Sequence, residues 1–257
     1  MVVRSVMLLV FVLASVAGYS QQQDSIQAKA VSVPTTKKKT SRPDIPGSIV
    51  VELGLNFKNG VVPPDFQKGF WGSRTLNIYY QYQIRILKSR FSFTPGIGLS
   101  LERWKFTNNY TLTNSPVPDG VYAGTYALVP ANSLYPGVTI NRSQLINNYI
   151  EMPLELRYDT APEDIARSIN LAFGARFGIL YDSFTKIDFS EGGEDKSIKN
   201  KQNHGMNTLR YGLYGRIGVG GFGIFSYVNM SPMFQDNKGP IQTSMNSVTI
   251  GISVNGF

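Results

Sequence analysis

The chain has 257 residues, no cysteine and a formal net charge of +8. The lack of cysteine excludes disulfides, thiolate metal sites and a cysteine nucleophile. Much of the positive charge lies in residues 37–39 and Arg42, outside any predicted strand, so it indicates a basic tail and argues against a nucleic-acid-binding surface.

Residues 1–20 have the pattern of a secretory signal peptide. Arg4 precedes an apolar run over residues 6–17, which is too short to span a bilayer, and the small residues Gly18 and Ser20 suit cleavage after Ser20. An uncleaved anchor is the alternative. No later segment is apolar over about 18 consecutive residues, so any membrane crossing is expected to be made by strands that close into a barrel.

Residues 21–46 are rich in Gln, Ser, Thr, Lys and Pro and contain few large apolar residues. Such a segment buries too little surface to fold alone. We therefore expect a disordered periplasmic extension over residues 21–46, followed by a folded domain over residues 47–257.

From residue 47 onward, apolar and polar residues alternate with the period of two that is typical of strands. The sixth and seventh of the expected strands are the weakest, and in the seventh Phe225 and Tyr227 fall on the otherwise polar face. The expected strands are residues 48–57, 75–86, 91–102, 150–159, 169–182, 209–218, 222–230 and 248–255.

The connections between these strands alternate in length, as they do in outer-membrane barrels with tight periplasmic turns and longer extracellular loops. This alternation predicts an all-β, transmembrane, up-and-down antiparallel barrel of about eight strands, with both ends on the short-turn side. The short connections are residues 87–90, 160–168 and 219–221, and the long ones are residues 58–73, 103–148, 183–207 and 231–246.

The polar faces of the strands contain Gly, Ser, Thr, Asn and Gln, and no Lys lies in a strand core. A water-facing sheet usually carries Lys and Glu, so we expect the apolar face to contact lipid; a soluble lipocalin-like barrel is the alternative. Aromatic residues near strand ends are candidates for girdles at the membrane interfaces: Phe57, Trp71, Trp104, Tyr149, Tyr158, Tyr181 and Phe257.

An eight-stranded barrel has an interior just wide enough for its own side chains to fill. The inward set of charged residues has both signs, which predicts ion pairs across the lumen; a gated proton or ion path is the alternative. This structural charge network is expected to contain Glu52, Arg85, Glu102, Glu151, Glu155, Arg157, Arg176, Arg210 and Arg216.

The sequence offers little for catalysis, and we expect no catalytic residue, cofactor or metal. The single histidine, His204, lies beside Asn203 and Gly205 and is interpreted as part of a solvated turn. Glycines over residues 218–223 fit a tight turn. Four acidic residues could bind a divalent cation, but lysines intermingle with them, which favours a solvated mixed-charge loop: Asp188, Glu191, Glu194 and Asp195.

The run from Asn148 to Tyr158 resembles the strand motif Tyr-aliphatic-Glu-aliphatic-Pro-Leu of the PorT-like small outer-membrane β-barrel proteins of Bacteroidetes. The run beginning at Gly174, with the sequence GARFGILY, is similar to the strand that follows in those proteins. The resemblance covers about residues 47–257. It implies an outer-membrane location and, for some members, a part in protein secretion or gliding machinery. The terminal Phe257 resembles a barrel-insertion signal but is out of register with Val254.

These features predict a non-enzymatic barrel that serves as a structural or interaction component. Its expected partners are outer-membrane lipids and a protein that binds the long extracellular loops, above all residues 103–148. A narrow transport channel and a soluble periplasmic binder are the alternatives.

Overall fold

The computed structural model describes residues 47–114, 126–164, 167–240 and 243–256. The predicted signal peptide, the predicted extension over residues 21–46 and Phe257 lie outside this part of the chain. Within it, no helix is long and apolar enough to cross a membrane.

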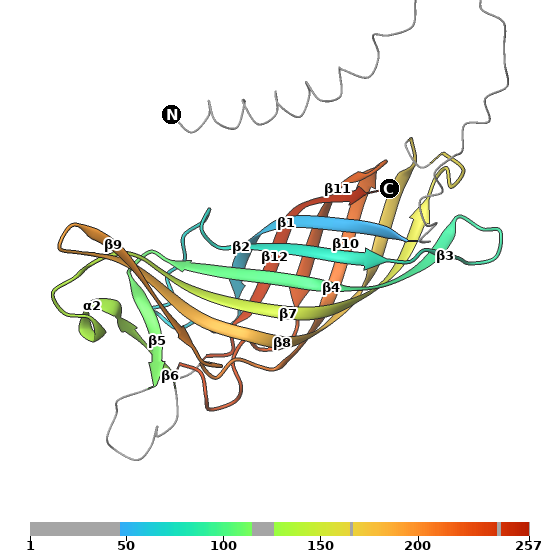
Figure 1. Cartoon of the computed structure of the whole chain (residues 1–257). Helices are drawn as coiled ribbons and strands as arrows, with labels where there is room; N and C mark the ends of the chain where they lie inside the picture. The colour runs from blue at the N-terminus through green and yellow to red at the C-terminus, as the bar shows by residue number, and fades with distance from the viewer. Residues whose placement is uncertain (1–46, 115–125, 165–166, 241–242, 257) are drawn as a thin grey trace, which may run out of the picture. The chain divides into compact units, whose positions relative to one another are not determined.

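Eight antiparallel strands close into a barrel (Figure 1). Each strand pairs with the next one around the barrel, and β1 pairs with β12 from Ile49 opposite Gly256 to Asn59 opposite Asn246. This closure confirms the predicted all-β, up-and-down barrel. The eight strands are β1 (Ser48–Asn59), β2 (Arg74–Gln81), β4 (Phe91–Phe106), β7 (Thr139–Asp159), β8 (Ile169–Glu191), β10 (Leu209–Val219), β11 (Phe222–Asn229) and β12 (Asn246–Gly256).

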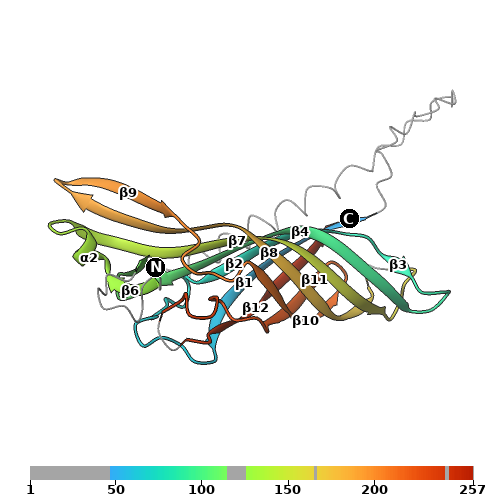
Figure 2. The ribbon, with the colours of Figure 1, turned by 90° about the horizontal axis from the view of Figure 1, so that it is seen from below.

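Four shorter strands and a helical turn complete the described structure. β3 (Ile84–Arg85) continues along β4 where β2 ends. β9 (Glu194–Lys201) pairs with the far end of β8, and this hairpin extends past the barrel (Figures 1 and 2). β5 (Tyr110–Asn114) and β6 (Tyr126–Pro130) form a separate two-stranded sheet, followed by α2 (Ala131–Leu134).

The two ends of the barrel differ in the way that the connection lengths predict. β10 and β11 are joined by Gly220 and Gly221, and Gly220 has a φ of 59°, so this tight turn needs glycine. The start of β1 and the end of β12 lie at this turn end, which confirms the predicted parity. We call the opposite end the loop end.

Two segments predicted as long loops are largely strand, which corrects the expectation for residues 103–148 and 183–207. β4, β7 and β8 all run several residues beyond the predicted boundaries, and β9 pairs with the added part of β8. There many outward side chains are charged, as at Lys105, Arg142 and Asp188, and apolar ones such as Phe184 no longer form an unbroken row. The apolar outward face, which marked the strands in the sequence, ends where the predicted contact with lipid ends.

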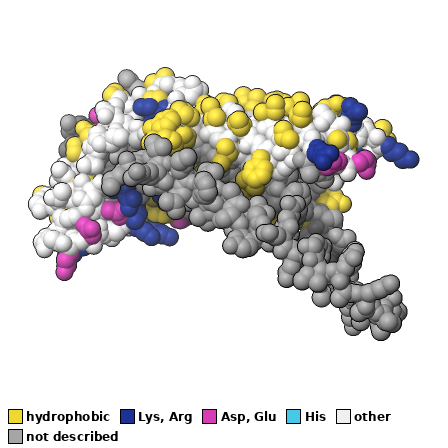
Figure 3. All heavy atoms as spheres, turned by 90° about the horizontal axis from the view of Figure 1, so that it is seen from above, with side chains coloured by type: hydrophobic (Ala, Val, Ile, Leu, Met, Phe, Trp, Pro, Cys, Tyr) yellow, Lys and Arg dark blue, Asp and Glu magenta, His cyan; other side chains and the backbone are white. Residues whose placement is uncertain are grey.

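The outward side chains along the middle of the barrel are apolar and exposed, as at Ile97 and Phe173, which are 60% and 63% exposed. Figure 3 shows apolar side chains over the visible face of the barrel, with charged ones gathered near its ends. A lipocalin-like barrel would hold its apolar face inside, so the observed polarity contradicts that alternative and confirms the predicted orientation.

Two of the predicted girdle residues face inward instead. Trp104 is fully buried and Tyr149 nearly so, because they have the same parity as their inward neighbours Glu102 and Glu151. Trp71 and Tyr181 are exposed, at 77% and 50%. Phe57 and Tyr158 are half-buried.

A small apolar core closes the loop end of the barrel. Phe66 packs edge-on against Trp104 and Phe106, with ring centroids 5.6 and 5.1 Å apart. At this end the inward face therefore changes from polar to apolar. We call this core the loop-end plug; its buried members are Phe66, Trp104, Phe106, Leu112, Leu145, Met206, Met233, Phe234 and Met245.

We predict that Ile97→Arg destabilises the barrel in lipid by about 2–4 kcal/mol, because the charge would lie near the bilayer midplane. Val61→Arg is the control, since Val61 is similarly exposed, at 58%, but lies in the connection between β1 and β2. Urea unfolding of the protein refolded into vesicles measures both. Equal effects of the two substitutions would contradict the lipid-facing orientation of β4.

Candidate functional site

The lumen of the barrel is the site where buried polar chemistry is concentrated. Inward positions of the strands place five carboxylates and four guanidiniums there, each at most 6% exposed. They lie in successive layers from the turn end to the loop end. These residues are Glu52, Glu102, Glu151, Glu155, Asp159, Arg157, Arg176, Arg210 and Arg216.

The two layers nearest the turn end are simple ion pairs with an amide on each. Arg157 lies 2.9 Å from Asp159, which also accepts a hydrogen bond from Gln83 at 3.2 Å. In the next layer Arg216 lies 3.1 Å from Glu155, and Gln81 donates to the other oxygen of that carboxylate at 2.6 Å. Each buried carboxylate thus has a charged and a neutral donor, which offsets its loss of hydration.

The central layer is organised around Arg176 and Glu52, whose side chains lie 2.9 Å apart. Tyr214 and Asn77 donate to the same carboxylate at 3.0 and 2.9 Å. The Arg176 guanidinium also lies 3.8 Å from the centroid of the Tyr214 ring, a cation–π arrangement that is strengthened by desolvation. Tyr79 connects this layer to the next, because it donates a hydrogen bond to Glu151 and accepts one from Arg176.

The layer next to the loop-end plug has one arginine between two glutamates. Arg210 lies 2.7 Å from Glu102 and 2.6 Å from Glu151, donates to Ser100 and stacks 3.7 Å from the centroid of the Tyr149 ring. The indole of Trp104, a member of the plug, donates to Glu102. The polar filling and the apolar plug are therefore continuous.

Arg85 is the one residue of the predicted network that the structure places elsewhere. Its side chain is 43% exposed and pairs with the exposed Glu163 at 3.1 Å, at the turn end. The reason is local: β2 ends at Gln81, and only Ile84 and Arg85 resume pairing with β4, beyond the filled lumen. Asp159, Tyr79 and Tyr214 are members that the sequence analysis missed, although the parity of Arg157 indicates that Asp159 faces inward.

His204 is buried, which corrects its interpretation as part of a solvated turn. Its side chain is fully inaccessible, and its ring lies edge-on to Tyr126 with centroids 5.5 Å apart. Burial lowers the pKa of His204 below the ordinary 6.5. The backbone explains the position, since His204 and Gly205 both have positive φ and fold the chain back against residue 238.

The acidic residues of the predicted mixed-charge loop lie on the β8–β9 hairpin. Asp188 contacts Arg142 at 2.5 Å and Lys186 at 3.1 Å, and Glu191 contacts Lys196 at 2.9 Å. Among the described residues, no group of three or more acidic or histidine side chains could hold a metal ion.

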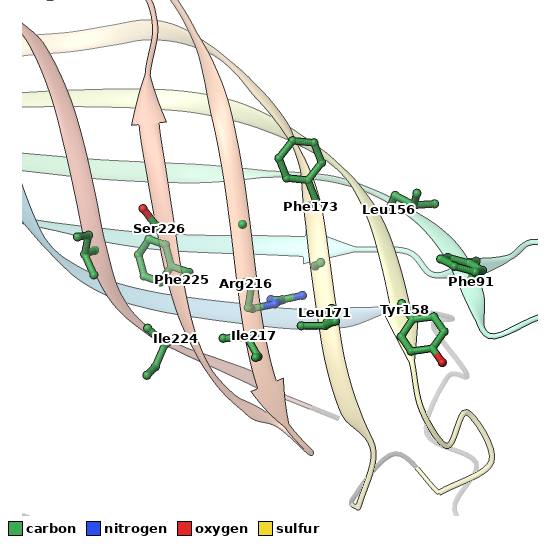
Figure 4. Close-up of a pocket in the computed structure, with 13 residues that line it drawn as sticks. Phe91, Leu156, Tyr158, Leu171, Phe173, Arg216, Ile217, Ile224, Phe225 and Ser226 are labelled. Atoms are coloured by element: carbon green, nitrogen blue, oxygen red, sulfur yellow. The ribbon is translucent and has the colours of Figure 1, made fainter.

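A hollow of about 560 Å³ lies on the outer surface (Figure 4). Gly215 and Ser226 oppose each other on β10 and β11, and a Cβ added at Gly215 would meet open space. The lumen residue Arg216 also borders the hollow, but most of its lining is apolar and includes the outward Phe173 and Ile224. Since these side chains belong to the apolar band, the hollow faces lipid.

These features define a class: a small β-barrel with an apolar outer band and a lumen filled by charged side chains. A family profile described as outer membrane protein beta-barrel domain matches residues 37–235. The chain belongs to this family and is a bacterial outer-membrane β-barrel. A search of curated proteins found no match.

Among solved structures, similarity is found to Ail, the attachment invasion locus protein of Yersinia pestis. One structure of Ail, in complex with the heparin analogue sucrose octasulfate, is 12% identical and the other 13%; both cover 81% of this chain and 97% of Ail with a TM-score of 0.31. A triple-mutant porin of Rhodopseudomonas blastica is 10% identical over 81% of this chain and 99% of the porin, with a TM-score of 0.18. TM-scores this low carry no argument about function.

We predict that Arg210→Met destabilises the barrel by about 3–5 kcal/mol, because Glu102 and Glu151 would remain buried without their shared cation. Arg85→Met is the matched control, since an exposed pair contributes at most about 1 kcal/mol. Urea unfolding in micelles measures both. Adding Glu102→Gln and Glu151→Gln to Arg210→Met should restore part of the loss; no recovery would contradict an electrostatic origin.

We also predict that the loop-end plug opens more readily as the pH falls below about 6.5. The pKa of His204 is lowered in the folded state, so an open state binds the proton more tightly, and stability that is complete above pH 6.5 is lost below it. Hydrogen exchange at the Met206 and Gln235 amides, corrected for intrinsic rates, measures the opening. In His204→Phe this pH dependence should vanish; its persistence would assign it to other groups.

Proposed function

We propose that this protein is a non-enzymatic outer-membrane barrel that acts as a structural and interaction component. The observation that carries the proposal is the continuous filling of the lumen, from the Arg157–Asp159 pair at the turn end to the plug around Trp104. A lumen packed in this way leaves the surface of the loop end as the place where another molecule can bind.

The absence of enzymatic activity is part of this proposal. His204 is buried beside Tyr126. On the β8–β9 hairpin, Asp188 and Glu191 form ion pairs, and Asp195 accepts hydrogen bonds from Ser190 and Asn141. Neither group has the accessible base and nucleophile that acyl transfer or hydrolysis requires.

We propose that residues 1–20 are a signal peptide and that the barrel is oriented with residues 21–46 in the periplasm. This orientation is supported by the position of the first described strand, whose start lies at the end with the tight turns. The motif from Tyr149 to Leu154 supports kinship with the PorT-like proteins of Bacteroidetes. On that resemblance we assign the chain to a secretion or surface-assembly machine.

The β8–β9 hairpin is the surface best suited to a protein partner. Among the described residues, β9 pairs only with β8, so its other edge presents backbone donors and acceptors to an added strand. β9 contains the exposed residues Lys196, Lys199 and Lys201, whose charges would oppose the pairing of this edge with the same edge of a second copy.

A narrow channel is the second candidate function, favoured by the charged layers that follow the lumen. Carboxylates and guanidiniums succeed one another from Asp159 to Glu102, which is the arrangement that a gated proton or ion path would use. In the packed state these groups bind one another.

Planar-bilayer recording separates the two candidates. We expect the purified protein to give no steady conductance of the size seen for a wide porin, because side chains fill an eight-stranded lumen. Steady openings of that size would overturn the filled-lumen proposal. Small currents that are specific for protons or one ion would instead favour the narrow channel.

The interaction role is tested with a photo-crosslinking residue placed at Lys199 on β9, compared with one at Lys88 at the turn end. Both positions are exposed. We expect a specific crosslinked protein from intact outer membranes at position 199 and none at position 88. Ile198→Pro should remove the crosslink, since it distorts the edge strand; recovery of the chain alone from every position would count against the role.

A further inference from the structure

An uncompensated group of cations lies on the outer surface at the loop end. Arg74 on β2 and Arg103 on β4 are direct cross-strand partners and both point outward. Lys105 is the next outward residue of β4. Like charges placed directly opposite each other are destabilising, so this arrangement needs an explanation. We call Arg74, Arg103 and Lys105 the cationic row.

The row lies where the apolar band ends. The outward residues of β4 are apolar from Phe91 to Leu101. These ten residue steps, at about 3.3 Å per step and a tilt of about 40°, span about 25 Å of bilayer thickness, which matches the apolar band of outer-membrane barrels. Arg103 follows directly and is therefore at the depth of lipid headgroups.

The protein supplies little negative charge near the row. Within the described residues, Arg74, Arg103 and Lys105 form no ion pair, whereas the neighbouring Asp188 is taken up by Arg142 and Lys186. Lys105 lines an open hollow whose other charged residues are Arg142, Lys196, Asp188 and Asp195, so these four balance one another and leave the charge of Lys105 in excess. The excess of positive charge remains at the three residues of the row.

Aromatic side chains lie beside the row at the same depth. Phe70 and the 77% exposed Trp71 pack edge-on with centroids 5.2 Å apart, and the ammonium of Lys68 lies 4.7 Å from the centroid of Phe57. The segment is held against the row through Gly72, where a Cβ would meet the Lys105 side chain at 2.5 Å. Exposed tryptophan and cationic side chains together are typical of the membrane interface.

We propose that the cationic row binds the phosphate group of an outer-leaflet lipid. Two adjacent guanidiniums present forked donors that match phosphate oxygens, and Lys105 adds a further charge. The long loops of outer-membrane barrels are extracellular, so the ligand at this depth is a headgroup of the outer leaflet. The bound phosphate neutralises the Arg74–Arg103 repulsion, which explains why the pair is tolerated.

The test uses the full-length protein in micelles of an uncharged maltoside detergent, with diphosphoryl lipid A or its dephosphorylated form added. Native mass spectrometry measures the lipid retained. We expect retention of the phosphorylated lipid only, and roughly tenfold weaker binding in the double variant Arg74→Gln, Arg103→Gln. Arg85→Gln with Arg90→Gln, an equal charge change at the exposed turn end, should bind as the unmodified protein does.

Several outcomes would overturn the proposal. Equal retention by the unmodified protein and by the Arg74→Gln, Arg103→Gln variant would remove the row from the site, and an equal loss in the turn-end control would reduce the effect to net charge. Inorganic phosphate that competes as well as diphosphoryl lipid A at equal concentration would show that the site recognises the free anion and gains nothing from the lipid. Thermal unfolding in lipid-free micelles identifies a folding defect; there the double variant should be at least as stable as the unmodified protein, because the repulsion is gone.

Discussion

The pairing of β1 with β12 is the contact on which the rest of the structure depends. In lipid, each backbone amide and carbonyl must find a partner within the protein, and a sheet achieves this only when its first and last strands meet. Closure also fixes the two faces. Each residue of a barrel strand then points either to lipid or into a narrow lumen, so Ile97 and Glu102 differ in environment because they differ in parity.

A barrel closed at eight strands has a narrow lumen, and in this protein large charged side chains fill it. The lumen cannot hold a large side chain at every inward position. Glycines therefore lie next to the largest ones, Arg176, Arg210 and Tyr227. A Cβ at Gly178 would lie 3.1 Å from both Arg210 and Glu151, and one at Gly212 would meet the Tyr227 ring at 2.8 Å. Each of these ions contacts at least one ion of opposite charge, because an unpaired ion in this space would be far more unfavourable than a neutral side chain. Filling and neutralisation are therefore satisfied by the same contacts.

The strands were predictable from the sequence where lipid imposes a rule. Contact with hydrocarbon requires the outward residue to be apolar, and this produced the alternation that identified all eight barrel strands. Beyond the apolar band the rule lapses. The outward residues Lys105, Arg142 and Asp188 resemble those of a loop, so the outer parts of β4, β7 and β8, and all of β9, were not predicted. The inward position of Trp104 could be predicted, because Trp104 has the same parity as Glu102. The bulge at Tyr181 could not, because it is defined by the pairing of β8 with β7; beyond it, inward and outward positions of β8 are exchanged.

The site residues were predictable to the same extent and for the same reason. Parity along a strand places Glu151 and Arg210 in the lumen, but it cannot say which acid meets which base, because this depends on the stagger between strands that are distant in sequence. Arg85 has the inward parity but lies beyond the packed lumen. β2 ends at Gln81 and pairing resumes only at Ile84, and the alternation of residues does not show this break. His204 lies in a connection between strands, where residues do not alternate, so the sequence pattern cannot predict whether its side chain is buried.

The departures from regular alternation accumulate at one end, and this asymmetry separates two surfaces. The turn end has the tight turn at Gly220 and Gly221 together with exposed side chains such as Arg85 and Glu163. The loop end has the β8–β9 hairpin above the apolar band and the cationic row at its boundary. The packed side chains of the lumen lie between these surfaces and the turn end. The row contacts lipid from the side, whereas the open edge of β9 lies farther along the sheet, so binding at one surface does not require the other to be vacant.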